Sequence, residues 1–249
     1  MDFSADLRYA FRSLAKAPAF TTVAVLSLAL GIGANTGVFT LLDQVLLDLM
    51  PVKDPGSLVQ FKEVGQNYGN NSGMNALSYP IYRDFRDQNE VFTGMLARYY
   101  EPASVSFRGR EERIAIELVS GTYFPVLGLE PAAGRLFGTA DDGPPSGAPY
   151  AVLGYDYWQS RFGGDRSVVG KPILVNGHPL QIVGVASKGF MGMEAMFTAQ
   201  LYVPITMAPD LTGYEKPLEN RRQRWVQVFG RLKPGVTLAQ AQASLAPIF

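Results

Sequence analysis

The longest apolar stretch of the chain lies near its start, where 26 consecutive residues, 17–42, carry no charge. Pro18 separates this stretch from the segment before it, because proline interrupts helical hydrogen bonding. A helix over residues 17–42 would be about 39 Å long, against a bilayer hydrocarbon core of about 30 Å. The pattern therefore predicts a transmembrane helix over residues 17–42 that spans the bilayer with some tilt.

Residues 1–16 combine an apolar stripe and a basic stripe, both at helical spacing. The apolar stripe consists of Phe3, Leu7, Ala10, Phe11 and Leu14, and the basic stripe consists of Arg8, Arg12 and Lys16. This pattern predicts an amphipathic helix on the inner membrane surface, with its cations toward anionic headgroups. A solvated basic leader is the alternative.

The charges around the apolar stretch predict its orientation. Basic residues precede it, whereas Asp43 and Asp48 follow it. An excess of Lys and Arg marks the cytoplasmic side, so the N-terminus is expected inside and the rest of the chain outside. A cleaved signal peptide is the competing interpretation, but its apolar core has only about 7–15 residues, so a permanent anchor fits better.

Small residues recur every four positions within the predicted membrane helix, at Ala29, Gly33 and Gly37. Such a stripe lets another helix approach closely in lipid, so we expect this helix to pack against other membrane spans. A dinucleotide-binding loop is the other possibility for the glycines. Gly31 and Gly33 lack the third glycine and the preceding strand that such a loop needs.

Beyond Pro51 the pattern becomes that of a mixed α/β domain. Strands are predicted over residues 58–64, 104–108, 112–119, 150–154 and 225–232, a helix over residues 155–162, and loops over residues 65–75 and 141–149. In residues 112–119 apolar and charged positions alternate, which predicts one solvated sheet face. Asn176 and Gly177 predict a type I′ hairpin turn within residues 171–185.

Two helix starts carry capping signals. Ser78 is predicted to cap a short helix with Pro80 in its first turn. Thr237 and Gln240 form a capping box that opens a final helix. Nothing caps that helix before Phe249, so we expect it to continue there and the chain to be part of something longer.

Composition excludes several kinds of function. The chain has 22 Lys and Arg and 22 Asp and Glu, so no net field attracts a polyanion, and nucleic acid is not expected as a partner. With no cysteine, it has no disulfide, zinc-thiolate site or thiol nucleophile. Its hydrophobic share of 47% fits a domain with a real core.

No residue pattern specifies chemistry. Residues 164–171 resemble a P-loop but are one residue too long, with Pro172 in place of the Ser or Thr. His178, the one histidine, is expected in an exposed turn. Asp141 and Asp142 are expected to be solvated loop acids and not a calcium site. We therefore predict no catalytic, cofactor or metal site, and no enzyme activity.

Several stretches in order resemble MacB-like and FtsX-like ABC permeases of the orphan type, without a fused ATPase. The first two, DLRYAFRSL (6–14) and LALGIGANT (28–36), are similar to the first transmembrane segment of those permeases. The others are similar to the MacB-type periplasmic core domain: LSYPIYRD (77–84), VSGTYFPVLG (119–128), AAGRLF (132–137), WQSRFGGD (158–165), VVGKPILVNGHP (168–179), IVGVA (182–186) and GRLKPGVTLAQA (230–241).

The resemblance implies an α+β periplasmic core domain over residues 51–249. Within it, a ferredoxin-like porter lobe (about 51–119 and 218–249) carries an inserted β-rich lobe (about 120–217). The resemblance also implies three later membrane helices, a dimer, and a separate cytoplasmic ATPase that holds the ATP. A periplasmic adaptor protein and membrane lipid are further implied partners.

The leading hypothesis is that this chain is the N-terminal part of such a permease. It would couple the ATPase to the extracytoplasmic domain in efflux or mechanotransmission, at the bacterial inner membrane. The alternative is a single-span, membrane-anchored module for periplasmic binding or sensing. A membrane-anchored hydrolase is a third class, which the missing nucleophile and base disfavour.

Overall fold

A computed structural model describes residues 51–62, 69–72, 75–194 and 198–248 of the chain. The predicted interfacial helix (1–16) and transmembrane helix (17–42) lie outside the described residues. Within the described part, no helix has the length and apolar character needed to cross a membrane.

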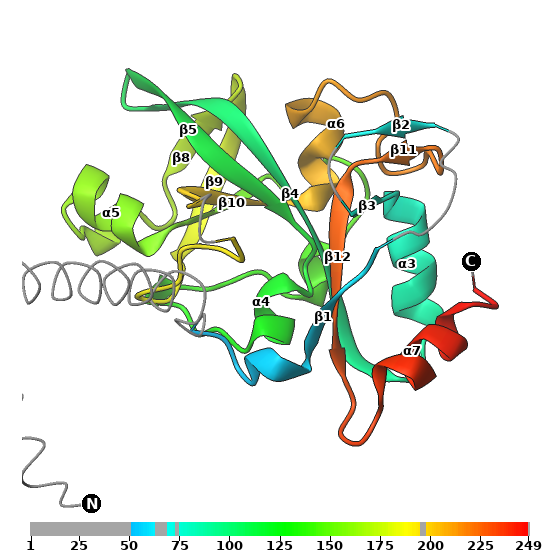
Figure 1. Cartoon of the computed structure of the whole chain (residues 1–249). Coiled ribbons are helices and arrows are strands. Elements are labelled where there is room, and N and C mark those ends of the chain that lie inside the picture. Colours follow the sequence, from blue (N-terminus) through cyan, green and yellow to red (C-terminus); the bar gives the residue numbers. More distant parts are fainter. Residues whose placement is uncertain (1–50, 63–68, 73–74, 195–197, 249) are drawn as a thin grey trace, which may run out of the picture. The chain divides into compact units, whose positions relative to one another are not determined.

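The described residues form a mixed α/β domain (Figure 1). The strands are β1 (Leu58–Gln60), β2 (Asn70–Asn71), β3 (Ala76–Leu77), β4 (Phe92–Phe107), β5 (Arg110–Val119), β6 (Ala133–Gly134), β7 (Tyr150–Leu153), β8 (Pro172–Val175), β9 (His178–Val185), β10 (Leu201–Pro204), β11 (Gln223–Arg224) and β12 (Val226–Leu232). The helices are α3 (Tyr79–Gln88), α4 (Tyr123–Leu127), α5 (Tyr155–Phe162), α6 (Ala208–Leu211) and α7 (Leu238–Leu245).

Ten strands belong to one sheet, ordered β1-β12-β4-β5-β10-β7-β9-β6, while β3 pairs with β12 and β8 pairs with both β4 and β9. The double pairing of β8 closes a ring of six strands: β4, β5, β10, β7, β9 and β8. A closed ring of strands hides its backbone edges, and its inner side chains fill a core. The domain therefore contains a small barrel that shares β4 with the open part of the sheet.

Strand β4 is long because it serves both parts. Its first half pairs with β12 up to Arg98, and its second half pairs with β8 at Val105 and Ser106. Pro102 lies in the gap between these two pairings, where its missing N–H costs no hydrogen bond on that side. β4 therefore leaves β12 at this point and enters the barrel.

Local signals in the sequence account for several elements. The Ser78 hydroxyl accepts the Ile81 amide at the start of α3, and the Thr237–Gln240 capping box opens α7. At the β8–β9 turn, Asn176 and Gly177 have φ of 47° and 84°, as a type I′ turn requires. These predictions are confirmed. The final helix is shorter than predicted: it was expected to continue at Phe249, but α7 ends at Leu245.

Two hydrophobic cores hold the sheet. The larger one fills the barrel and extends under α3, where Tyr82 and Trp225 are among its largest buried side chains. The smaller one packs α4 and the segment around Phe190 against the opposite face, with Tyr123 and Tyr202 at its centre. Both faces of the central strands are therefore covered, and one of these cores surrounds a charged cluster.

Candidate functional site

A buried charged cluster lies on the face of the sheet that carries the smaller core. The Arg98 guanidinium, on β4, donates to Gln227 on β12 (2.8 Å) and to Glu117 on β5 (3.0 Å). Its third bond goes to Glu194 (2.5 Å), which comes from the connection between β9 and β10. Arg98 is 2% exposed, so one cation joins three segments inside the protein.

Glu117 is the least solvated member of the cluster, at 1% exposure. Burial raises the pKa of its carboxyl, and the nearby charge of Arg98 and the hydroxyl of Tyr123, which donates to it at 3.3 Å, only partly oppose this. The predicted solvated face of residues 112–119 is therefore wrong at Glu117: Tyr123 and Tyr202 cover this position, and Arg98 balances its charge.

Arg98 and Glu117 were not among the residues predicted from the sequence, although their surroundings carried a signal. Arg98 follows three buried apolar residues, and Glu117 stands between Ile116 and Leu118. A charged residue within an apolar strand is buried only when it is paired, so two such strands suggest that the charges meet. The strand register decides which charges meet. That register cannot be read from the residues next to each charge in the sequence.

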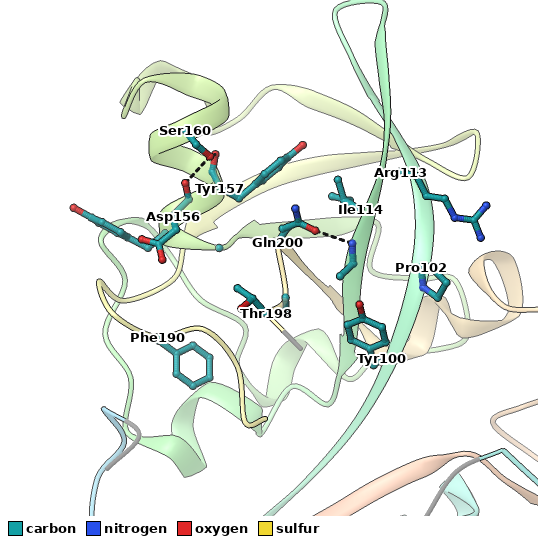
Figure 2. Close-up of a pocket in the computed structure, with 14 residues that line it drawn as sticks. Tyr100, Pro102, Arg113, Ile114, Asp156, Tyr157, Ser160, Phe190, Thr198 and Gln200 are labelled. Carbon is teal, nitrogen blue, oxygen red and sulfur yellow. Dashed lines mark hydrogen bonds between the residues drawn. The ribbon is translucent and has the colours of Figure 1, made fainter. Parts of the chain in front are cut away.

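A second feature is an open cleft of about 680 Å³ between the β4–β5 hairpin, the start of α5 and the segment that leads into β10 (Figure 2). Rings of Tyr100, Tyr155, Tyr157 and Phe190 line it. Arg113 supplies a cation on the hairpin side and Asp156 an anion on the helix side, and both are exposed.

The floor of this cleft is fixed by Gln200. Its side-chain oxygen accepts a hydrogen bond from the backbone N–H of Ala115 (2.8 Å). Its backbone N–H donates to the Ala115 carbonyl (3.0 Å), so Gln200 extends the β5–β10 pairing by one position. The hydroxyl of Ser160 donates to the Asp156 carbonyl in its own helix (2.8 Å). The cleft therefore presents the polar side chains of Asp156, Ser160 and Gln200 beside its aromatic rings.

The two loop acids differ from expectation. Asp141 is buried and accepts two hydrogen bonds from Arg135, at 2.8 and 2.9 Å. Burial raises the pKa of Asp141, but the bonds from Arg135 and the Gly138 amide outweigh it and leave the pKa below its ordinary value. Asp142 accepts the Gly121 amide (2.6 Å), and burial raises its pKa. Both acids therefore have structural partners, and the prediction that they are solvated was wrong.

Other predicted residues have simpler outcomes. His178 is exposed at the start of β9, as predicted. The described residues include no group of three or more His, Cys, Asp or Glu side chains that could hold a metal ion. The proposed helix-packing residues Ala29, Gly33 and Gly37, and the membrane-surface cations Arg8, Arg12 and Lys16, lie outside the described residues.

Several solved structures share this fold. The periplasmic region of MacB from Actinobacillus actinomycetemcomitans matches with a TM-score of 0.57 and 16% identity, covering 82% of this chain and 87% of that one. The extracellular domain of the noncanonic ABC-type transporter YknZ from Gram-positive bacteria matches at 0.54 and 15%, covering 75% and 88%. A domain of a putative permease protein from Porphyromonas gingivalis matches at 0.55 and 16%, covering 70% of each chain.

A comparison of sequences identifies the family. The model of the MacB-like periplasmic core domain matches residues 21–248, so the chain belongs to that family. The family is a domain of ABC-type transporter permeases, as the resemblance of the motifs implied. No curated protein matches the chain in sequence.

Proposed function

We propose that this chain is the N-terminal part of a permease subunit of an ABC-type export or mechanotransmission system. The observation that carries the proposal is the family match over residues 21–248, which includes most of the predicted membrane helix and the whole described domain. The described domain would be the extracytoplasmic part, at the outer face of the bacterial inner membrane, with the N-terminus in the cytoplasm.

The proposed role is coupling without bond chemistry. ATP would be held by a separate cytoplasmic ATPase, whose cycle moves the outer domain through the membrane helices. The permease would act as a dimer, and a periplasmic adaptor protein and membrane lipid are the further partners that we propose. The purified chain should neither bind nor hydrolyse ATP. Saturable ATP binding at micromolar concentrations would contradict this division of labour.

The division into two lobes is part of the proposal. The porter lobe (about 51–119 and 218–249) would include β1, β12 and the first half of β4. The inserted β-rich lobe (about 120–217) would supply β7, β8, β9 and β10 to the barrel. The continuous hydrogen bonding of β4 and β5 supports a mechanical link between the two, because both strands enter the barrel.

Topology provides the first test. The chain has no cysteine, so Asn71→Cys, at an exposed position of β2, gives a single labelling site. In intact cells without an outer-membrane barrier, an impermeant maleimide should label this cysteine. A Ser4→Cys control should be labelled only after lysis, because the basic stripe places it inside. Labelling of Asn71→Cys only after lysis would reverse the proposed orientation.

The open cleft supports a second candidate function. The volume of the cleft, about 680 Å³, lies within the usual range for small-ligand sites. Its lining includes four aromatic rings and two opposite charges. This observation favours a single-span module for periplasmic binding or sensing. The gene sequence beyond residue 249 separates the two candidates: further apolar spans support the permease, and a stop codon with a stable product supports the module.

A further inference from the structure

A smaller pocket of about 290 Å³ opens where β12 and β4 diverge. It is distinct from the cleft in Figure 2, although Tyr100 lines both. Its charged side chains are Arg98 and Glu194, its aromatic side chains are Tyr99, Tyr100 and Trp225, and its other lining residues are Ser72, Ala76 and Gln227. The charged cluster therefore has an opening to solvent.

The cluster contains two carboxylates and one guanidinium. Arg98 has each of its three nitrogens bonded to an acceptor, and its side chain is only 3% exposed. Glu117 is fully enclosed, whereas the Glu194 side chain is 33% exposed. The group that this cluster presents to the pocket is therefore the carboxylate of Glu194.

The aromatic wall is held in place by its own contacts. Tyr99 packs edge-on against Trp225, with ring centroids 5.2 Å apart and an interplanar angle of 76°. The Tyr99 hydroxyl is hydrogen bonded to the Tyr214 hydroxyl (2.7 Å). The indole N–H of Trp225 donates to the Pro217 carbonyl (3.0 Å). The rings of Tyr99 and Trp225 are thus fixed before any ligand arrives, which lowers the entropy cost of binding.

We propose that this pocket binds a small organic cation, an amine or quaternary ammonium group on a compact apolar body, with Glu194 as its counter-charge. Aromatic rings attract such cations through their π-electrons, and the attraction grows when the site is partly dry. A carboxylate beside the rings offsets the loss of solvation of the cation. This proposal uses only residues of the described domain, so it does not depend on whether the chain is a permease.

An anionic ligand is the opposite possibility, because Arg98 also lines the pocket. A carboxylate ligand would have to displace Glu194 from the guanidinium, or else lie beside a carboxylate of the same charge. Either arrangement has an unfavourable electrostatic free energy, whereas a cation next to Glu194 has a favourable one. The geometry therefore favours the cation, and the two possibilities predict opposite effects when Glu194 is neutralised.

The test uses the full chain in a nonionic detergent. The chain has two tryptophans, so Trp158→Phe leaves Trp225, in the pocket wall, as the sole tryptophan. Benzyltrimethylammonium is titrated while Trp225 emission is recorded, with benzyl alcohol and benzoate as neutral and anionic probes. We expect a saturable change with the ammonium probe and at least tenfold weaker binding of the other two.

Charge variants then locate the site. Glu194→Gln should weaken ammonium binding at least tenfold, Glu194→Asp should retain part of it, and Glu130→Gln, at an exposed position outside the pocket, should leave it unchanged. Thermal unfolding of each variant checks that it folds. If Glu194→Gln fails to fold, Glu194→Asp and the probe series still decide. No saturable ammonium binding, tighter benzoate binding, or no effect of either Glu194 substitution would overturn the proposal.

Discussion

Arg98 is the cation at the centre of the buried charged cluster. A buried guanidinium loses several kcal/mol of hydration, and only good partners offset that loss. The partners here come from three segments that are far apart in sequence, so Arg98 links strand pairing to the loop that carries Glu194. Removing the cation would leave Glu117 buried without its counter-charge.

Arg98→Met should therefore lower the free energy of unfolding by about 3–5 kcal/mol, the usual effect of removing one partner of a buried ion pair. Urea denaturation at neutral pH measures this change. Arg113→Met is the matched control, because Arg113 is exposed on the adjacent strand and should change stability by less than about 0.5 kcal/mol. If both substitutions lowered the free energy of unfolding equally, the buried ion pair would contribute no more to stability than an exposed arginine does.

Glu117 gives a prediction about pH. Its pKa in the folded domain is raised above the ordinary value of 4.5, so the folded state holds this proton more tightly than the unfolded state does. The contribution of Glu117 to stability is therefore complete below pH 4.5 and is lost as the pH rises through the folded pKa. Glu117→Gln cannot lose a proton, so its stability relative to wild type should improve with rising pH. A difference independent of pH would contradict this.

Among the elements, the β6–β9 pairing depends on a very close backbone approach. Gly134 pairs with Gly184, and a Cβ added to Gly184 would lie 2.0 Å from the Arg135 carbonyl oxygen. Gly184→Ala should thus destabilise the domain by roughly 1–3 kcal/mol, or more if the strands separate. Gly138→Ala is the control, because a Cβ there meets nothing within 4 Å. Thermal unfolding should separate the two variants clearly.

Elements with local signals could be predicted from the sequence, and elements without them could not. The β8–β9 hairpin and α7 follow from turn and capping residues that act over a few positions. β10 was missed because it lies between β5 and β7, and all four of its residues are buried, so no alternation marks it. α4 was missed because its five residues are almost uniformly apolar.

The candidate sites could not be predicted, because they join distant parts of the chain. Arg98 and Glu194 are 96 positions apart, and Arg98 and Gln227 are 129 apart. Such contacts are decided by strand order and register, which only the assembled sheet determines. The sequence did identify the family, because motif order over most of the chain carries more information than any one residue.

For the whole molecule, the continuity of the sheet is the property most relevant to coupling. Strand β4 is paired with β12 at one end and lies in the closed barrel at the other, with β5 alongside throughout. Because packed sheets deform little, we expect the described domain to move as one body when it is displaced. Under the proposed function, a displacement from the cytoplasm would reach this domain through the proposed membrane helices.

The predicted membrane helix would be a working part only if it packs against its neighbours. Gly33 and Gly37, with Ala29, form the stripe that would permit close approach, so Gly33→Leu with Gly37→Leu should preserve insertion while separating the helices. In the complete permease, we expect loss of association with the other spans and loss of ATPase-dependent activity. Gly31→Leu, off the stripe, should change neither. If the double variant keeps both, the stripe faces lipid and the helix only anchors the domain.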